Sequence, residues 1–241
     1  MNEQEVYYTI ALTPMTGVNF QTALHLYQVM GGGKAVYEHR LDIRDVLPEC
    51  SDRLAASLRD WSIALQRAAQ EMEFIQKHRI QALCLGSDRY PQRLAECQDA
   101  PIVLYYLGNA DLNQRRIVSI IGTRHCTVYG QDLIRHFMAD LRQQCPEVLV
   151  VSGLAYGIDI NAHRQALQNG YETVGVLAHG LDDLYPSVHR ETAKQMVTQG
   201  GLLTEFMSET RSEKINFVKR NRIVAGMSDA TILVETAEKG G

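Results

Sequence analysis

The chain has 241 residues, of which 45% are hydrophobic and 22% are charged, and its formal net charge is −4. This composition is ample for a buried core, and it excludes a mainly disordered chain, a collagen-like fibre and a small disulfide scaffold. The length suits one or two domains, and the acidic balance confines any nucleic-acid contact to a local patch.

The cysteines and the N-terminal segment indicate a cytoplasmic protein. There are 5 cysteines, widely spaced and without a Cys-x-x-Cys pair, so we expect reduced thiols rather than a disulfide framework or a zinc site. The N-terminal segment has neither the basic nor the apolar region of a signal peptide. No apolar run approaches the roughly 18 residues of a membrane-spanning helix, so we expect no membrane association.

The first third of the chain is predicted to be helical. Apolar residues recur near helical spacing over residues 19–30, and the three glycines of residues 31–33 then end the helix. Ser51 is predicted to cap a helical pattern that continues to Ile75. Residues 1–78 are therefore expected to form a small helical domain. A helix–glycine-turn–helix unit either binds a nucleic-acid backbone through its turn amides or only packs, and both interpretations remain open.

From residue 79 onward, strand and helix patterns alternate. The predicted strands are residues 82–85, 102–107, 117–121, 148–151, 173–178, 202–204 and 231–234, and a helical stripe occupies residues 129–144. Short apolar runs that alternate with helices predict a doubly wound, mainly parallel sheet with both faces covered. Ligands of such sheets bind beyond the carboxyl ends of the strands, where this sequence concentrates its glycines.

Gly122, Thr123 and Arg124 connect a predicted strand to the following helix. The glycine permits close approach, exposed amides and the helix N-terminus favour an anion, and Arg124 can donate hydrogen bonds to a phosphate. The loop lacks the GxGxxG pattern of dinucleotide binding. The alternative interpretation is a tight turn with a surface arginine.

The loop after the next strand also contains small residues, namely Ser152, Gly153, Ala155 and Gly157. Asp159 is expected in the first turn of the helix that follows, four residues before His163 and hence on the same helix face. A metal pair or an acid–base dyad is one interpretation of these two residues. A hydrogen-bonded pair at the helix start is favoured, because the sequence positions no third ligand and no nucleophile.

Positive charge is concentrated in residues 211–222. The cations are Arg211, Lys214, Lys219, Arg220 and Arg222, and Glu213 is the one acidic residue among them. Phe217 lies within the same segment. Basic side chains with an aromatic ring are typical of single-stranded nucleic-acid binding, where cations contact the backbone and the ring stacks on a base. The alternative is a solvated basic helix start with Phe217 in the core.

Taken together, these segments resemble the DNA-processing protein A (DprA/Smf) family. The matching segments are residues 88–91, 100–105, 120–124, 152–159, 180–182, 200–205 and 217–222. The resemblance covers nearly the whole chain and is strongest over residues 79–241, for which it implies an extended Rossmann-like domain. The helical N-terminus is similar to the family's sterile-alpha-motif or helix-hairpin-helix-like domain.

The family resemblance implies a protein that binds single-stranded DNA without sequence preference and is not an enzyme. It implies protection of the strand, help in loading the RecA recombinase during recombination or natural transformation, a homodimer, and no cofactor, metal ion or catalytic residue. The DNA-binding residues that it implies are Gly122, Thr123, Arg124, Ser152, Gly153, Ala155, Gly157, Phe217, Lys219, Arg220, Asn221 and Arg222.

Two features depart from the family pattern. Ser187 and His189 stand where the family usually has a lysine and an asparagine, so one phosphate contact is either missing or supplied by Arg190. The family also continues beyond the point where this sequence stops. We therefore expect a truncated or incomplete chain, with the dimerisation surface in the later part and an exposed edge strand in the sheet.

Two other functions are compatible with the same fold. One is a nucleotide phosphoribohydrolase, whose family requires a Pro-Gly-Gly-x-Gly-Thr-x-x-Glu loop that this sequence lacks. The other is a sensor of a small nucleotide. Both remain alternatives to single-stranded DNA binding.

Overall fold

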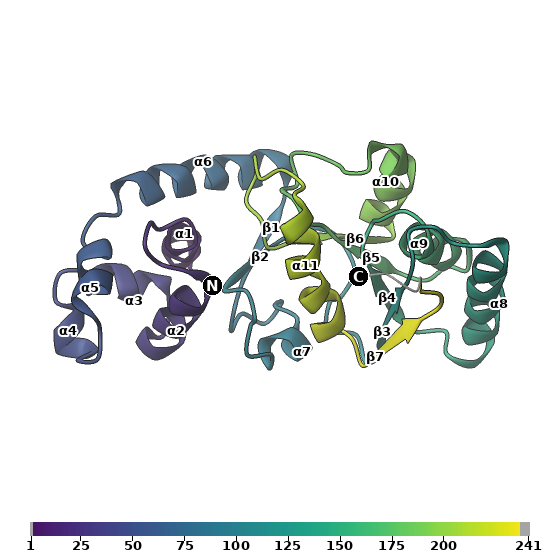
Figure 1. The fold of residues 1–241 in the computed structure, drawn as a ribbon, viewed down its shortest axis with the longest axis horizontal. Coiled ribbons are helices and arrows are strands. Elements are labelled where there is room, and N and C mark those ends of the chain that lie inside the picture. Colours follow the sequence, from purple (N-terminus) through teal and green to yellow (C-terminus); the bar gives the residue numbers. More distant parts are fainter. Residues whose placement is uncertain (1, 237–241) are drawn as a thin grey trace. The chain divides into compact units, whose positions relative to one another are not determined.

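The computed structural model describes residues 2–236 and divides into two compact units. One unit consists of Met1–Asp88 with Gln98–Leu104, and the other of Arg89–Cys97 with Tyr105–Gly241. The helices and strands of each are labelled in Figure 1.

The N-terminal unit is mainly helical. Its elements are α1 (Glu3–Leu12), α2 (Phe20–Met30), α3 (Gly33–Glu38), α4 (Ile43–Val46), α5 (Asp52–Ser57), α6 (Ser62–His78) and the strand β1 (Gln81–Cys84). The helix predicted over residues 19–30 is confirmed. The Asn19 side chain accepts a hydrogen bond from the Thr22 N–H, and Gly31 ends the helix with a left-handed φ of 82°.

The prediction of one helical run from Ser51 to Ile75 is wrong, because the chain breaks between α5 and α6. Ser51 does cap α5, accepting from the Leu54 N–H at 3.2 Å. At the break the Trp61 indole N–H donates to the Leu58 carbonyl at 2.7 Å. Leu58 and Trp61 are both buried, so the apolar spacing continues across the break and hides it.

The glycine turn between α2 and α3 is occupied by the chain's own carboxylate. The N–H groups of Gly33 and Lys34 donate to the two Glu5 carboxylate oxygens at 2.6 and 3.2 Å. The Thr9 hydroxyl donates to the same carboxylate at 3.0 Å. A Cβ on Gly33 would lie 2.5 Å from the Thr9 nitrogen, so the glycine permits α1 and α3 to pack closely. These contacts favour a packing role for this turn.

The second unit is an α/β sheet with its helices. Its elements, starting with the strand shared between the units, are β2 (Val103–Gly108), α7 (Gln92–Ala95), β3 (Ile117–Ile121), α8 (Val128–Gln144), β4 (Leu149–Ser152), α9 (Ile158–Gln168), β5 (Thr173–Val176), η1 (Ser187–His189), α10 (Arg190–Thr198), β6 (Gly200–Thr204), α11 (Lys214–Gly226) and β7 (Ala230–Leu233). Each predicted strand is present, with small shifts at the ends.

The strand order of the sheet is β1-β2-β6-β5-β4-β3-β7. β2 runs antiparallel to β6, with Tyr106 opposite Leu203. The strands β6, β5, β4, β3 and β7 are parallel to one another. The prediction of a doubly wound, mainly parallel sheet is therefore confirmed, and the carboxyl ends of five strands meet at one edge.

Two apolar clusters hold the helices to this sheet. Ile120 and Val150 of the sheet pack with Met138 of α8 and Ala162 of α9. A second cluster joins α9 and α10 to β6, and it includes Met196. Figure 1 shows α8 and α9 side by side. None of the helices between residues 2 and 236 combines the length and the apolar character needed to cross a lipid bilayer.

The carboxylate that caps α3 gives a stability prediction. Glu5→Gln removes the charge that accepts from the Gly33 and Lys34 amides, so it is expected to lower the free energy of unfolding by about 1–2 kcal/mol. Urea denaturation followed by circular dichroism measures this change. Glu3→Gln is the matched control, because exposed Glu3 lies in the same first turn of α1. Equal losses in both variants would contradict a specific role for Glu5.

Candidate nucleic-acid interface

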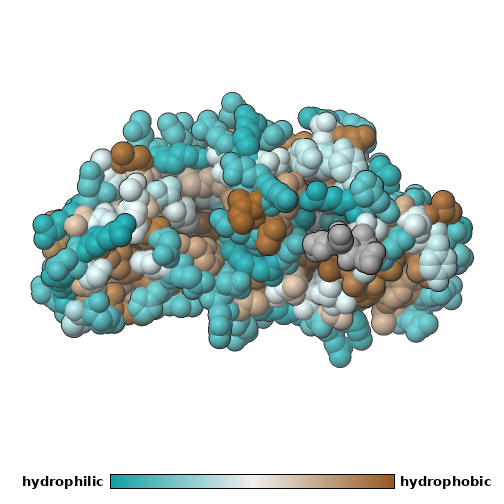
Figure 2. All heavy atoms as spheres, in the orientation of Figure 1, coloured by the Kyte–Doolittle hydropathy of each residue, from teal (hydrophilic) through white to brown (hydrophobic). Residues whose placement is uncertain are grey.

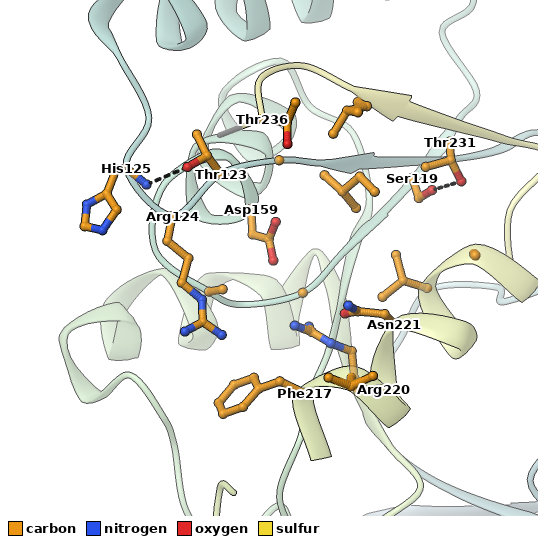
Figure 3. A pocket seen from close by; sticks show the side chains of 18 of the residues that line it. Ser119, Thr123, Arg124, His125, Asp159, Phe217, Arg220, Asn221, Thr231 and Thr236 are labelled. Atoms are coloured by element: carbon orange, nitrogen blue, oxygen red, sulfur yellow. Dashed lines mark hydrogen bonds between the residues drawn. The ribbon is translucent and has the colours of Figure 1, made fainter. Parts of the chain in front are cut away.

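A cavity of about 490 Å³ opens where the carboxyl ends of β3, β4 and β7 meet α11. Figure 3 shows the side chains that converge on it. Its walls consist of Ser119, Ile121, Gly122, Thr123, Arg124, His125, Gly153, Ala155, Asp159, Lys214, Phe217, Val218, Arg220, Asn221, Val224, Ala225, Thr231, Leu233 and Thr236.

Most of the predicted site residues line this cavity. They are Gly122, Thr123, Arg124, Gly153, Ala155, Phe217, Arg220 and Asn221. The structure places Ser152, Gly157, Lys219 and Arg222 outside the lining.

A buried pair of opposite charges lies at the base of the cavity. Asp159 on α9 and Arg220 on α11 face each other beside Gly153 (Figure 3), and they are 7% and 5% exposed. A Cβ on Gly153 would overlap both Nη1 of Arg220 and Oδ2 of Asp159, so a larger residue there would displace the ends of these side chains. Nη1 of Arg220 also donates to the Val176 carbonyl at 2.6 Å.

The two charges of this pair respond to burial in opposite senses. Burial raises the pKa of Asp159, and the positive charge of Arg220 opposes this rise. Burial lowers the pKa of Arg220, and the carboxylate of Asp159 opposes this fall. Each charge therefore depends on its partner to remain ionised in the core.

Ser152 and Gly157 lie outside the lining of the cavity, and they stabilise the loops that form it. The Ser152 hydroxyl is fully buried and donates to the Ile120 carbonyl at 2.6 Å. Gly157 has a φ of 79° and starts α9. A Cβ on Gly157 would overlap the Thr123 carbonyl oxygen and lie 2.6 Å from the Arg124 carbonyl carbon. Gly157 thus lets the two loops lie against each other.

The basic side chains of α11 point in different directions, because they lie on the turns of a helix. Arg220 points toward Asp159, whereas the Arg222 guanidinium contacts the Glu205 carboxylate at 2.5 Å. Lys219 is exposed and lies outside the lining. Figure 2 shows a mostly hydrophilic face with an apolar patch beside α11, where Ile215 and Val218 are exposed. Consecutive helical residues point about 100° apart, so a run of charge in sequence is not a basic patch in space.

An arginine and an aromatic ring meet at the mouth of the cavity. The Arg124 guanidinium carbon lies 5.2 Å from the centroid of the Phe217 ring. The Tyr185 ring meets Phe217 edge-on, with centroids 5.8 Å apart. Within residues 2–236, the Arg124 guanidinium has no hydrogen bond or ion pair to protein, so its donors are available to a ligand. Phe217 is half-buried. Its exposure lies between those of the two sequence interpretations, a ring that stacks on a base and a ring in the core.

One of the expected exposed amides of the 122–124 loop has a partner within the chain. The Thr123 N–H donates to the Glu235 carbonyl at 2.8 Å. The Glu235 carboxylate accepts from the Thr127 N–H at 3.0 Å, at the N-terminus of α8. The His125 N–H donates to the Thr123 hydroxyl at 3.1 Å. Thr127 itself caps α8, because its hydroxyl accepts from the Gly130 N–H at 3.1 Å, and Glu235 holds the Thr127 backbone from the end of β7. The Arg124 side chain is available as an anion donor of this loop.

The predicted pairing of Asp159 with His163 is wrong. His163 is fully buried, with Nδ1 2.7 Å from the Thr173 hydroxyl and Nε2 at hydrogen-bond distance from the Gly153 carbonyl. Burial is the main cause that lowers the pKa of His163 to about 4. A neutral ring with its proton on Nε2 donates to the Gly153 carbonyl. The single Thr173 hydroxyl proton then goes either to Nδ1 or to the Val150 carbonyl, which lies 2.9 Å from the hydroxyl oxygen. His163 therefore fixes the loop that carries Gly153.

The residues that replace the expected lysine and asparagine lie in η1. Ser187 is exposed, whereas His189 is buried. Arg190 is exposed at the start of α10.

Among residues 2–236, no three His, Cys, Asp or Glu side chains are grouped to hold a metal ion.

Several lining residues escaped the sequence analysis. Ser119 on β3 and Thr231 on β7 join their hydroxyls at 2.8 Å inside the cavity (Figure 3). A serine inside an otherwise apolar strand is a signal that could have identified the first of them. His125 and Thr236 carry no comparable signal.

Among the described lining side chains, Arg124, Lys214 and Arg220 outnumber the carboxylate of Asp159, so the cavity favours an anion.

The sequence is similar to proteins of known family. The profile described as DNA recombination-mediator protein A matches residues 81–241. The DNA processing protein DprA of Streptococcus pneumoniae is 36% identical over 154 residues, which are 64% of this chain and 54% of that protein. The chain spans about half the length of the curated relatives it matches.

Two solved structures are similar as well. The X-ray structure of DNA processing protein A from Streptococcus pneumoniae has a TM-score of 0.76 and 28% identity, covering 98% of this chain and 79% of that one. DNA processing protein A from Helicobacter pylori has a TM-score of 0.58 and 27% identity, covering 68% of this chain and 73% of that one. The latter structure concerns that protein's single-stranded DNA binding mode.

The buried imidazole of His163 gives a pH prediction. Its pKa is about 4 in the folded chain, against an ordinary value of 6.5, so the unfolded chain binds more protons between these values. The contribution of neutral His163 to the free energy of unfolding is therefore fully present above about pH 6.5. It is lost as the pH drops toward 4, by about 3 kcal/mol in total.

Urea unfolding of the wild type and His163→Gln between pH 7.5 and pH 4 tests this. The stability advantage of the wild type over the variant is expected to shrink by about 3 kcal/mol across this range. His136→Gln is the control for removing an imidazole, because His136 is exposed on α8. A wild-type advantage that does not change with pH would contradict the proposed neutral, buried state of His163.

Proposed function

The chain belongs to the DNA recombination-mediator protein A family, and we propose that it binds single-stranded DNA at the cavity formed by the 122–124 loop, the 152–159 loop and α11. The observation that carries this proposal is the Arg124 guanidinium over the Phe217 ring at the cavity mouth. A cation beside an aromatic ring offers a phosphate contact and a stacking surface for an unpaired base.

The proposed contacts do not depend on base identity. Arg124 and Lys214 carry charge that any phosphate can meet, and every base has a flat face that can stack on Phe217. Asn221 is exposed beside them and can reach a sugar, a phosphate or a base edge. A base within a duplex is already stacked and paired, so this arrangement favours a single strand.

We propose that the chain acts by binding and not by catalysis. The two ionisable groups that the sequence analysis considered as an acid–base dyad are used structurally. Asp159 faces the buried Arg220, and the ring nitrogens of His163 contact Thr173 and Gly153. A general base needs a free lone pair within reach of the substrate, which these contacts disfavour.

The cellular role that we propose follows the family. The chain would protect single-stranded DNA in the cytoplasm and help to load the RecA recombinase, in recombination or in natural transformation, and it would act as a homodimer. The family description as a recombination mediator and the structural similarity to DNA processing protein A support this extension.

Fluorescence anisotropy with a labelled oligothymidylate and a duplex of the same length tests the proposed function. We expect tighter binding to the single strand, weakening as salt rises, because cations on the protein displace counterions from the phosphates. Equal or tighter binding to the duplex would contradict the proposal. Direct binding of a nucleoside monophosphate by a chain that binds no strand would instead favour a nucleotide sensor, and release of its free base would favour a phosphoribohydrolase.

Arg124→Ala tests the cavity directly. It removes one phosphate contact and the cation over Phe217, so affinity for single strands of any sequence is expected to fall about tenfold. The slope of log affinity against log salt is expected to flatten by about one contact. Arg135→Ala is the matched control, because it removes the same charge from an exposed position on α8. Unchanged affinity in Arg124→Ala, or an equal loss in Arg135→Ala, would argue against this site.

A further inference from the structure

Two exposed tyrosines lie at the same edge of the sheet as the cavity. Tyr156 follows β4 and is 47% exposed, and Tyr185 follows β5 and is 46% exposed. Both belong to loops at the carboxyl ends of parallel strands, where sheets of this kind bind ligands. Each ring also packs against another ring of this edge, so the two exposed faces are held in place before a ligand arrives.

Tyr185 is fixed beside the cavity by its backbone and by its ring. Its N–H donates to Nε2 of His179 at 3.1 Å. His179 is itself buried, and its carbonyl accepts from the Thr204 hydroxyl at 2.9 Å. The Tyr185 ring meets Phe217 at 5.8 Å with an interplanar angle of 62°. Tyr185 therefore continues the aromatic surface of the cavity mouth outward.

Tyr156 packs on the segment that follows Tyr185. Its ring meets the His189 ring edge-on, with centroids 5.1 Å apart. The His189 N–H donates to the Pro186 carbonyl at 3.1 Å, which ties His189 to the turn after Tyr185. Burial, and then the charge of Arg164, lower the pKa of His189. The Tyr156 ring therefore rests on an imidazole that is uncharged at neutral pH.

Cations accompany the two tyrosines. Arg164 on α9 is exposed and acts on His189, and Arg190 is exposed at the start of α10. The nearby carboxylate of Asp183 is paired with Arg211 at 3.3 Å, which reduces its repulsion of an anion. The edge thus offers ring faces with positive charge beside them.

We propose that Tyr185 and Tyr156 form a second nucleobase-binding subsite, on which a single strand stacks its bases after it leaves the cavity. This inference rests on the proposed function, because it extends the same site. A ring contact joins Phe217 to Tyr185. The turn from Pro186 to His189 then links Tyr185 to Tyr156, whose ring packs on His189. Tyrosine suits this role because its ring stacks on any base while its hydroxyl stays in water.

Binding of short and long strands by the 241-residue chain tests the subsite. Unlabelled oligothymidylates of three and of nine nucleotides compete with a labelled strand, since only the longer one can reach beyond the cavity. Tyr185→Leu and Tyr156→Leu are each expected to weaken nonamer binding about tenfold and to leave trimer binding within about twofold of wild type. Tyr185→Phe and Tyr156→Phe keep the ring and are expected to bind as the wild type does.

The leucine and phenylalanine variants separate ring stacking from folding, because both keep apolar bulk at the position. Tyr129→Leu is the surface control, since Tyr129 is 72% exposed on α8. Nonamer affinities that match between the leucine and phenylalanine variants, or an equal loss in Tyr129→Leu, would overturn the subsite while the proposed function stands. A wild-type chain that binds neither strand would overturn the proposed function, and the subsite with it.

Discussion

The buried charge pair of Asp159 and Arg220 is the constraint on which the site depends. Two charges withdrawn from water cost several kcal/mol each unless each finds its partner, so α9 and α11 must hold these side chains face to face. Gly153 leaves the space beside them free, because a Cβ there would overlap and displace the ends of both side chains. Phe217 lies three residues before Arg220, on the same side of α11. The pair therefore also sets the position of the ring at the cavity mouth.

Much of the fold could be predicted from the sequence, because its central strands β4, β5 and β6 are buried on both faces and the strands read as short apolar runs. The break between α5 and α6 could not, since Leu58 and Trp61 both point into the core and preserve the helical spacing. The basic segment was misleading for a related reason. Adjacent residues of α11 point in different directions, so Arg220 is buried against Asp159 and Arg222 turns toward Glu205.

The two glycine-bearing loops of the site were predictable, because close approach at the carboxyl end of a strand requires small residues there. The contacts that complete the site join residues distant in sequence. Arg220 and Asp159 lie on different helices, α11 and α9, far apart in the sequence, and the Glu235 carboxylate after β7 accepts from the Thr127 N–H before α8. Spacing along the chain carries no information on such pairs. His163 was assigned to the wrong partner because helical periodicity identifies a shared face and not the strand beneath it, which supplies Thr173.

The most direct test of the central claim is to map where DNA touches the chain. A single strand that contains bromodeoxyuridine is cross-linked to the protein with ultraviolet light, and mass spectrometry identifies the modified residues. A strand bound at the cavity is predicted to cross-link to Phe217 and to residues of the 122–125 loop. Cross-links confined to residues 1–78, or to α8, would contradict the assignment of the cavity as the DNA-binding site.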